Sequence, residues 1–202
     1  MSNVQESLLS LDEVSQNLLF RTARTASKFT DEPVTDEQLR AIYDLFQWAP
    51  TSANTQPLRL LVVRSAEAKA RLNPYILEGN QAKVASAPVT VILAADHDFH
   101  ENIPRLLPFR PEMKDMFVDD AVREPFAHFN ASIQTGYFIL AVRAIGLAAG
   151  PLAGFDAAGV DNEFFAGTPL HSLLVVNIGT PADDAWFERL PRLAYDEVVT
   201  AI

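Results

Sequence analysis

The chain has 202 residues, of which 49% are hydrophobic and 21% charged, a composition typical of a soluble globular protein with one well-cored domain. Its formal net charge of −10 disfavours nucleic acid or an anionic membrane as the main partner, and the absence of cysteine excludes disulfides and thiolate chemistry. The N-terminal residues lack the pattern of a signal peptide, and the apolar stretches are shorter than a membrane span, so we expect a cytoplasmic protein.

The N-terminal half predicts two helices, then a strand, a short helix and a second strand. Residues 8–20 carry leucines and a valine at helical spacing. The sequence TDEQ at 35–38 has the form of a capping box and opens a helix that ends before Pro50. The run LRLLVV predicts a strand, and Ser65 caps the helix after it. The apolar run Val89–Ala95 is typical of a central strand that is buried on both faces.

The C-terminal half begins with an irregular stretch. Four prolines, mixed charges and several aromatic residues over 96–125 indicate an excursion from the regular fold. Residues 126–145 predict a long buried helix, which Gly146 ends. The sequence PLAGFD predicts a turn before a short helix, and His171–Gly179 predicts another buried strand. Without a repeat or a flexible linker, this order predicts one α+β domain over 1–202, with helices on both faces of a short mixed sheet.

Several familiar kinds of site are not supported. The sequence DHDFHE at 96–101 places two histidines among carboxylates, but such loose clusters are a weak metal signal, and we interpret it as a solvated strand end. The chain has no G-x-S-x-G nucleophile elbow, no P-loop and no G-x-G-x-x-G motif. We therefore expect no metal site, no catalytic triad and no glycine-loop nucleotide site.

Cationic and amide side chains remain as the chemical candidates. They are dispersed along the chain, at Arg24, Thr25, Asn80, Lys83, Arg189 and Arg192, with Gly154 in the PLAGFD turn. Together they suit a ligand with a phosphate at one end and a planar polar ring at the other, because arginine forks match phosphate oxygens.

A second candidate feature is the uncharged loop APTSANTQP at 49–57. It joins a helix to a strand through small hydrogen-bonding side chains between two prolines. Prolines fix backbone dihedrals and lower the cost of ordering such a loop. A helix cap followed by a turn would explain Pro50 but not the whole polar run.

The order of five motifs resembles the FMN-dependent nitroreductase family over nearly the whole chain. These motifs are ART…F, PTSANTQP, NQAK, PLAGFD and RLPRLAYDEV. WAPTSANTQPLRLLVV, GPLAGFD and the ending NIG…RLPRLAYDE resemble its malonic semialdehyde reductase branch most. The resemblance implies an α/β/α sandwich around a mixed, mainly antiparallel sheet. It also implies an intertwined homodimer with one FMN at each of two subunit interfaces.

The same resemblance implies roles for particular residues. Arg24, Thr25 and Ser27 take phosphate and ribityl positions, although family members commonly have a basic residue where Ser27 stands. Arg192 matches the C-terminal phosphate clamp, with Arg189 as an accessory. Asn80 and Lys83 face the pyrimidine edge of the ring. Ala153 and Gly154 match the turn whose backbone N–H reaches flavin N5, with Ala153 where many members have glutamate.

Two further regions would complete such a site. The resemblance implies that Pro50, Thr51, Ser52 and Asn54 reach the flavin held mainly by the other subunit. The excursion at 99–125 would cover the ring as a lid and set the size of the substrate. Its candidate substrate contacts are Phe109, Arg110, Phe117 and Arg123, because an arginine can hold a substrate carboxylate.

These features favour an FMN-dependent NAD(P)H oxidoreductase in which the flavin carries the chemistry and no side chain is catalytic. Its expected reaction is ping-pong reduction of malonic semialdehyde to 3-hydroxypropionate, with NADH or NADPH as the donor. One alternative is a broad-specificity nitroaromatic or quinone reductase. Another is a flavin-binding protein without turnover, and the last is an unrelated α+β domain.

Overall fold

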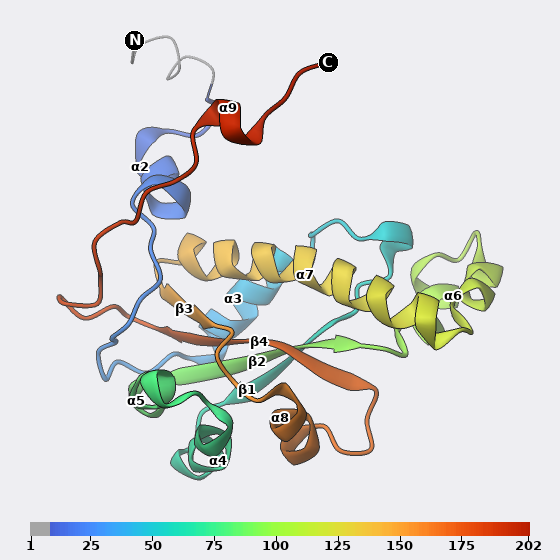
Figure 1. The fold of residues 1–202 in the computed structure, drawn as a ribbon, viewed down its shortest axis with the longest axis horizontal. Coiled ribbons are helices and arrows are strands. Elements are labelled where there is room, and N and C mark those ends of the chain that lie inside the picture. The colour runs from blue at the N-terminus through green and yellow to red at the C-terminus, as the bar shows by residue number, and fades with distance from the viewer. Residues whose placement is uncertain (1–8) are drawn as a thin grey trace.

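The computed structural model describes residues 9–202, and its centre is a four-stranded sheet. The strands are β1 (Leu58–Val63), β2 (Val89–Asp96), β3 (Ala148–Leu152) and β4 (Leu170–Gly179), in the spatial order β1-β2-β4-β3 (Figure 1). All three neighbouring pairs are antiparallel, and one register shift lies between Leu93 and Ala94 of β2. The predicted α+β class is confirmed, while these four strands show antiparallel pairing where the sequence predicted a mixed sheet.

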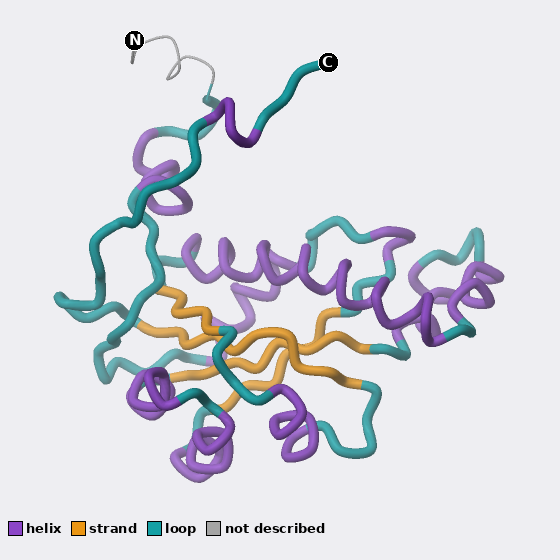
Figure 2. Tube along the Cα trace, viewed as in Figure 1, coloured by secondary structure: helices purple, strands orange, loops and turns teal. Residues whose placement is uncertain are grey.

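Helices cover both faces of this sheet, as Figure 2 shows. The helices α3 (Asp36–Phe46) and α7 (Asp120–Ala144) lie on one face. The other face is covered by α4 (Ala66–Leu72), α5 (Glu78–Ser86) and α8 (Ala157–Phe164). Along β2, alternate side chains join separate apolar clusters on the two faces, so the strand is buried on both sides as its apolar run predicts.

Side-chain caps fix the starts of three helices where the sequence predicts them. Thr35 and Gln38 form the capping box of α3, with backbone-to-side-chain distances of 2.8 and 3.2 Å. Ser65 Oγ accepts from Ala68 N at the start of α4, and Asp156 accepts from Gly159 N at the start of α8. These bonds satisfy backbone N–H groups that have no partner within the helix.

The N-terminal helix differs most from its prediction. Of the predicted range 8–20, Leu8 lies outside the described residues. The described part forms only α2 (Glu13–Gln16) and a π-helical turn at Asn17–Arg21. Most of its apolar side chains are exposed, Val14 by 76%, because no surface within residues 9–202 covers them.

The sequence did not predict α5 or β3, and it placed the start of α7 too late. The strand β3 contains Gly150 and Pro151, which weaken the strand signal. The helix α7 begins at Asp120, capped by Asp119, and continues through Pro125. The predicted irregular excursion is therefore mainly helical, with α6 (Ile103–Leu106) between 3-10 turns at Phe99–Asn102 and Pro111–Phe117.

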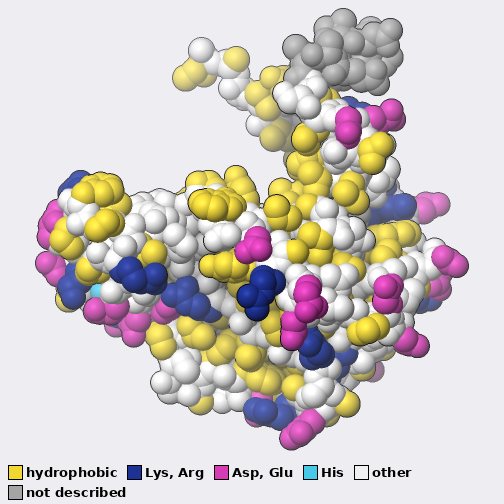
Figure 3. Space-filling view, turned by 180° about the vertical axis from the view of Figure 1, so that it is seen from behind, with side chains coloured by type: hydrophobic (Ala, Val, Ile, Leu, Met, Phe, Trp, Pro, Cys, Tyr) yellow, Lys and Arg dark blue, Asp and Glu magenta, His cyan; other side chains and the backbone are white. Residues whose placement is uncertain are grey.

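Both terminal segments extend beyond the layers of the sandwich. In Figure 1, α2 and α9 (Tyr195–Val198) protrude from the same end of the molecule. Figure 3 shows hydrophobic side chains along this protrusion and on the body beside it. Those exposed by 40% or more include Leu9, Leu11, Val14, Leu18, Phe20, Phe187, Leu190, Leu193, Tyr195 and Val198. Within residues 9–202, no helix has the length and apolar character that a membrane crossing requires.

Candidate functional site

A cationic pocket lies where the terminal segments leave the sandwich. Its volume is about 270 Å³, and its lining includes four arginines, Arg24, Arg143, Arg189 and Arg192, and one acidic residue, Glu188. Arg24 follows the π-helical turn, Arg143 belongs to the last turn of α7, and the other two lie in the extended C-terminal segment. Sequence reasoning identified three of these arginines and missed Arg143.

Backbone carbonyls are the hydrogen-bond acceptors of all four guanidinium groups. Arg24 donates to Phe187 O at 2.8 Å and Arg189 donates to Ala23 O at 2.9 Å, which joins the N- and C-terminal segments. Arg192 donates to Leu190 O and Pro191 O. Among the described residues, no carboxylate lies within ion-pair distance of any of the four. The pocket therefore holds an excess of positive charge suited to a polyvalent anion.

A second pocket of about 150 Å³ adjoins the first, since Thr25 and Phe187 line both. Its polar lining includes Ser27, Asn80, Lys83 and Asn177. Lys83 Nζ donates to Asn80 Oδ1 at 2.9 Å, so the two residues present one amide and one ammonium group on the same side. The structure thus brings together residues that are far apart in the sequence.

Bare backbone forms part of this second pocket. A Cβ at Gly150 would lie 2.6 Å from the backbone oxygen of Ala26, so only glycine fits there without displacing the chain. The nearby Gly154 would place a Cβ 3.1 Å from Asn80 Nδ2 and 3.0 Å from Leu77 Cδ1. Gly154 O accepts from Leu77 N, which fixes the PLAGFD turn beside α5.

Two predicted residues of this region have local roles as well. Ser27 Oγ donates to Ala185 O at 2.8 Å, and Ser27 N donates to the same oxygen. Its hydroxyl therefore holds the start of the C-terminal segment. Ala153 is exposed and offers only a methyl group next to Gly154.

The polar loop at 50–56 has a strained backbone. Ala53, Asn54 and Gln56 have φ angles of 54°, 52° and 44°, in the left-handed region that most side chains avoid. Two buried amides of α7 hold the loop, because Asn130 Oδ1 accepts from Ser52 N at 2.7 Å and Gln134 Oε1 accepts from Leu58 N at 2.9 Å.

Further bonds fix the side chains of the loop. Thr51 Oγ1 accepts from Gln56 N, and Asn54 Nδ2 donates to Leu106 O of α6. Pro50 and Ser52 are exposed. The predicted loop residues Pro50, Thr51, Ser52 and Asn54 line neither of the two pockets described above.

The four predicted substrate contacts have different surroundings. Phe109 is 78% exposed, and Arg110 is also exposed, with Glu112 Oε1 at 3.3 Å. Phe117 is buried in the core against Phe99 and Phe126, so its side chain is a packing group here. Arg123 donates to Phe117 O and pairs with Asp120, which ties the start of α7 to the preceding turn.

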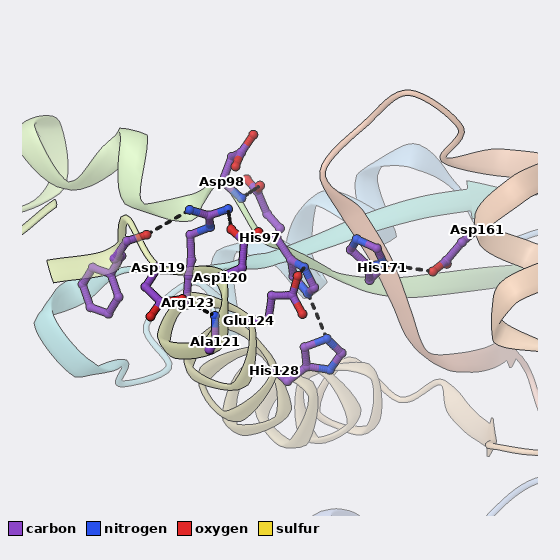
Figure 4. Close-up of polar contacts among 12 residues, drawn as sticks. His97, Asp98, Asp119, Asp120, Ala121, Arg123, Glu124, His128, Asp161 and His171 are labelled. Atoms are coloured by element: carbon purple, nitrogen blue, oxygen red, sulfur yellow. Dashed lines mark hydrogen bonds and ion pairs between the residues drawn. The ribbon is translucent and has the colours of Figure 1, made fainter. Parts of the chain in front are cut away.

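Three of the four histidines form a cluster at the opposite end of the sheet from the cationic pocket (Figure 4). The Nε2 atoms of His97 and His128 are 2.9 Å apart, and the rings of His97 and His171 stack with centroids 4.0 Å apart. Asp96 and His97 are both 7% exposed, so the interpretation of this stretch as a solvated strand end is wrong for these two residues, whereas Asp98 and Glu101 are exposed. Among residues 9–202, no group of three histidine or acidic side chains is arranged to hold a metal ion.

A cavity of about 550 Å³ lies along the edge of the sheet formed by β1, between α3 and α6. Its lining is mostly apolar, with Leu39, Tyr43, Phe46 and Leu60 among its residues. It contains none of the residues predicted to bind a cofactor.

Comparison with known proteins identifies the class. The nitroreductase family model matches residues 20–180. A Streptomyces griseus protein named "Putative NADH dehydrogenase/NAD(P)H nitroreductase" is 56% identical over 96% of this chain and 99% of its own. A Streptomyces coelicolor protein of the same designation is 58% identical, over 90% of each chain. The crystal structure of an Exiguobacterium sibiricum protein in complex with FMN matches with a TM-score of 0.83 at 19% identity, over 96% of this chain and 98% of that one. The chain belongs to the nitroreductase family, which places it among the oxidoreductases.

Proposed function

We propose that the chain binds FMN, with the phosphate in the cationic pocket and the ring over the pocket lined by Asn80 and Lys83. The observation that carries this proposal is the group of four guanidinium groups without a carboxylate partner, directly beside a pocket with a bare glycine wall. The Exiguobacterium protein of the same fold was crystallised with FMN, which supports the assignment.

The residues present fit both ends of such a cofactor. A phosphate monoester carries up to two negative charges, and arginine forks bind its oxygens bidentately. Gly150 lets the backbone of Ala26 approach the second pocket closely, because a Cβ at position 150 would lie 2.6 Å from Ala26 O. Lys83 and Asn80 supply hydrogen-bond donors at the edge of the second pocket.

When bound, FMN accepts hydride from NAD(P)H and delivers hydride to a second substrate in alternation, which is ping-pong turnover. The chain's own residues bind and polarise the ring. The ammonium group of Lys83 would favour negative charge at the pyrimidine edge, and the Gly154 turn, which packs against Asn80, would offer backbone groups to the ring. Ala153 contributes no acid, so the proton for a reduced carbonyl comes from water or from the lid.

The proposed second substrate is malonic semialdehyde, which would be reduced to 3-hydroxypropionate. The segment 99–125 would act as a lid. Arg110 would hold the substrate carboxylate in exchange for its exposed pair with Glu112, because Arg123 is engaged with Phe117 O and Asp120 within its own segment. A nitroaromatic or quinone acceptor is the second candidate. It is favoured by the designation of the Streptomyces relatives and by the exposed ring of Phe109.

We further propose that the site is shared between two copies of this chain in the cytoplasm, each a single domain over 1–202. Exposed apolar side chains on both terminal segments and on α7 need a covering surface, as do the edge of the sheet formed by β1 and its apolar cavity. The predicted loop residues Pro50, Thr51, Ser52 and Asn54 line neither pocket of the proposed flavin site in their own chain, and Pro50, Ser52 and Asn54 are exposed, as a loop that reaches the partner's flavin would be.

Turnover of matched substrates by the purified protein tests this function. We expect a yellow protein that NADH or NADPH bleaches without oxygen, with kcat/KM on malonic semialdehyde at least about tenfold above that on propanal, because propanal leaves the arginine unpaired. Equal values for the two aldehydes, with faster turnover of a nitroaromatic, would favour the second candidate. A yellow protein that neither donor bleaches would indicate flavin binding without turnover.

A further inference from the structure

Arg143 differs from the other arginines of the cationic pocket in the element of secondary structure that carries it. It belongs to the last turn of the 25-residue helix α7, whereas Arg24, Arg189 and Arg192 lie in irregular segments. Its Nη1 donates to Leu19 O at 3.1 Å, which holds one side of the guanidinium group. Its Nε is buried and has no hydrogen-bond partner among the described residues.

The electrostatics of Arg143 are unfavourable without an anion. Burial lowers the pKa of its guanidinium group, and the positive charge of Arg189 lowers this pKa further. Arginine nevertheless stays protonated in proteins, so the folded chain keeps a partly buried cation beside three others. The helix C-terminus favours a cation in this turn, but a solvent-exposed side chain would serve that purpose equally well.

We propose that Arg143 is a fourth ligand of the phosphate site, and that it makes the site selective for the phosphorylated flavin over riboflavin. The inference rests on the proposed function and adds a residue that the five motifs do not contain. Because Leu19 O accepts from Nη1 and Nε is buried, Nη2 is the donor of the fork that remains for a phosphate oxygen. The helix would fix one side of the phosphate site, and the irregular segments carry the other three arginines of the pocket.

Three full-length variants test this role. Arg143→Met removes the charge while keeping an apolar stem, Arg143→Lys restores the charge without the fork, and Arg40→Met removes an exposed cation of α3 as the matched control. Each protein is freed of flavin at high salt, checked by thermal melting, and titrated with FMN and with riboflavin at several salt concentrations.

We expect Arg143→Met to weaken FMN binding by about tenfold to a hundredfold while riboflavin binding changes by less than about twofold. The FMN affinity of Arg143→Lys should lie between those of Arg143→Met and the unaltered protein, and the FMN affinity of Arg40→Met should equal that of the unaltered protein. The salt dependence of FMN binding should be shallower in Arg143→Met, because one cation fewer meets the phosphate.

Two outcomes would overturn the proposal. Unchanged FMN affinity in Arg143→Met would show that the residue only anchors Leu19, and equal weakening of FMN and riboflavin would show a general structural role. If the unaltered protein binds neither flavin, the proposed function fails separately. The melting temperature with and without inorganic pyrophosphate then tests the role of Arg143 in anion binding. If pyrophosphate raises the melting temperature of the unaltered protein but not that of Arg143→Met, the anion site is supported. If pyrophosphate raises both equally, the proposal is overturned.

Discussion

The two ends of the sheet differ in whether their charged and titratable side chains have side-chain partners of opposite charge. At one end, three imidazoles contact one another, and acidic side chains lie beside them, Glu124 at 3.7 Å from His97 and Asp161 at 3.2 Å from His171. At the other end, four guanidinium groups face a common pocket and donate only to backbone carbonyls. Both ends gather titratable side chains from distant parts of the chain. Only the second keeps an excess of positive charge, because four arginines and one acidic residue, Glu188, line its pocket, and the proposed binding site rests on that imbalance.

Removing charge from the cationic end should have the largest effect. Arg24→Ala and Arg192→Ala should each weaken FMN binding by about 1.5–3 kcal/mol, the range for a hydrogen bond to a charged group. Isothermal titration of flavin-free protein measures this change. Glu124→Gln at the histidine end is the matched comparison and should leave FMN affinity within about twofold. Full FMN affinity in both arginine variants would place the phosphate elsewhere.

Filling the wall of the second pocket should have a comparable or smaller effect. Gly150→Ala would bring a Cβ to 2.6 Å from Ala26 O, a backbone atom that cannot move without its strand neighbours. Overpacking of this kind destabilises by about 1–3 kcal/mol and would narrow the pocket. Thermal melting and FMN titration measure the two consequences. Gly79→Ala is the control, because a Cβ there meets no atom within 4 Å. Equal melting temperatures and FMN affinities in the two variants would contradict close packing at Gly150.

The histidine end should respond to pH with the smallest effect. Burial lowers the pKa of His97 and His128, and the neighbouring His171 lowers both further, whereas Glu124 opposes the shift. Asp161 also opposes the shift of His128, and Arg123 adds to that of His97. The folded chain therefore binds these protons at lower pH than the unfolded chain does. Stability should be complete above the ordinary histidine pKa of 6.5 and should fall as the pH drops toward the lowered values.

Melting temperatures measured from about pH 8 to about pH 5 test this dependence. His128→Gln keeps a hydrogen-bonding group beside His97 but removes one titrating imidazole, so its melting temperature should fall less between about pH 8 and about pH 5. Glu124→Gln removes the opposing carboxylate, so its melting temperature should fall more. An identical fall in all three proteins would mean that other groups control the acid transition.

Local sequence signals predicted the parts of the fold that depend on neighbours in the chain. The capping box at Thr35 and the apolar run of β2 were confirmed. Hydrogen bonding over three residues and burial on both faces each require particular residue types at neighbouring positions, so both can be recognised in the sequence. The strand β3 was missed because Gly150 is selected for its close approach to Ala26 O and not for strand formation. The exposed N-terminal leucines indicated a helix face, but nothing in the pattern shows that its partner surface is absent from residues 9–202.

Motif order predicted residues of the candidate site that the structure brings together around two adjoining pockets. Arg143 was not predicted, because an arginine in the last turn of a helix is common in sequences where that turn is simply exposed to solvent. The histidine cluster was missed for a related reason. His97, His128 and His171 come from three different elements, and only the pairing of β2 with β4 and the packing of α7 bring them together.

The single helix α7 carries groups of three of the regions described above. His128 lies in the histidine cluster, Asn130 and Gln134 hold the polar loop, and Arg143 reaches the cationic pocket. Each added residue turns an α-helix by about 100° and lengthens it by about 1.5 Å. One inserted or deleted residue between Gln134 and Arg143 would therefore swing the guanidinium group to another side of the helix. Over evolutionary time, the length of this stretch should be far more constrained than the identity of its solvent-facing residues.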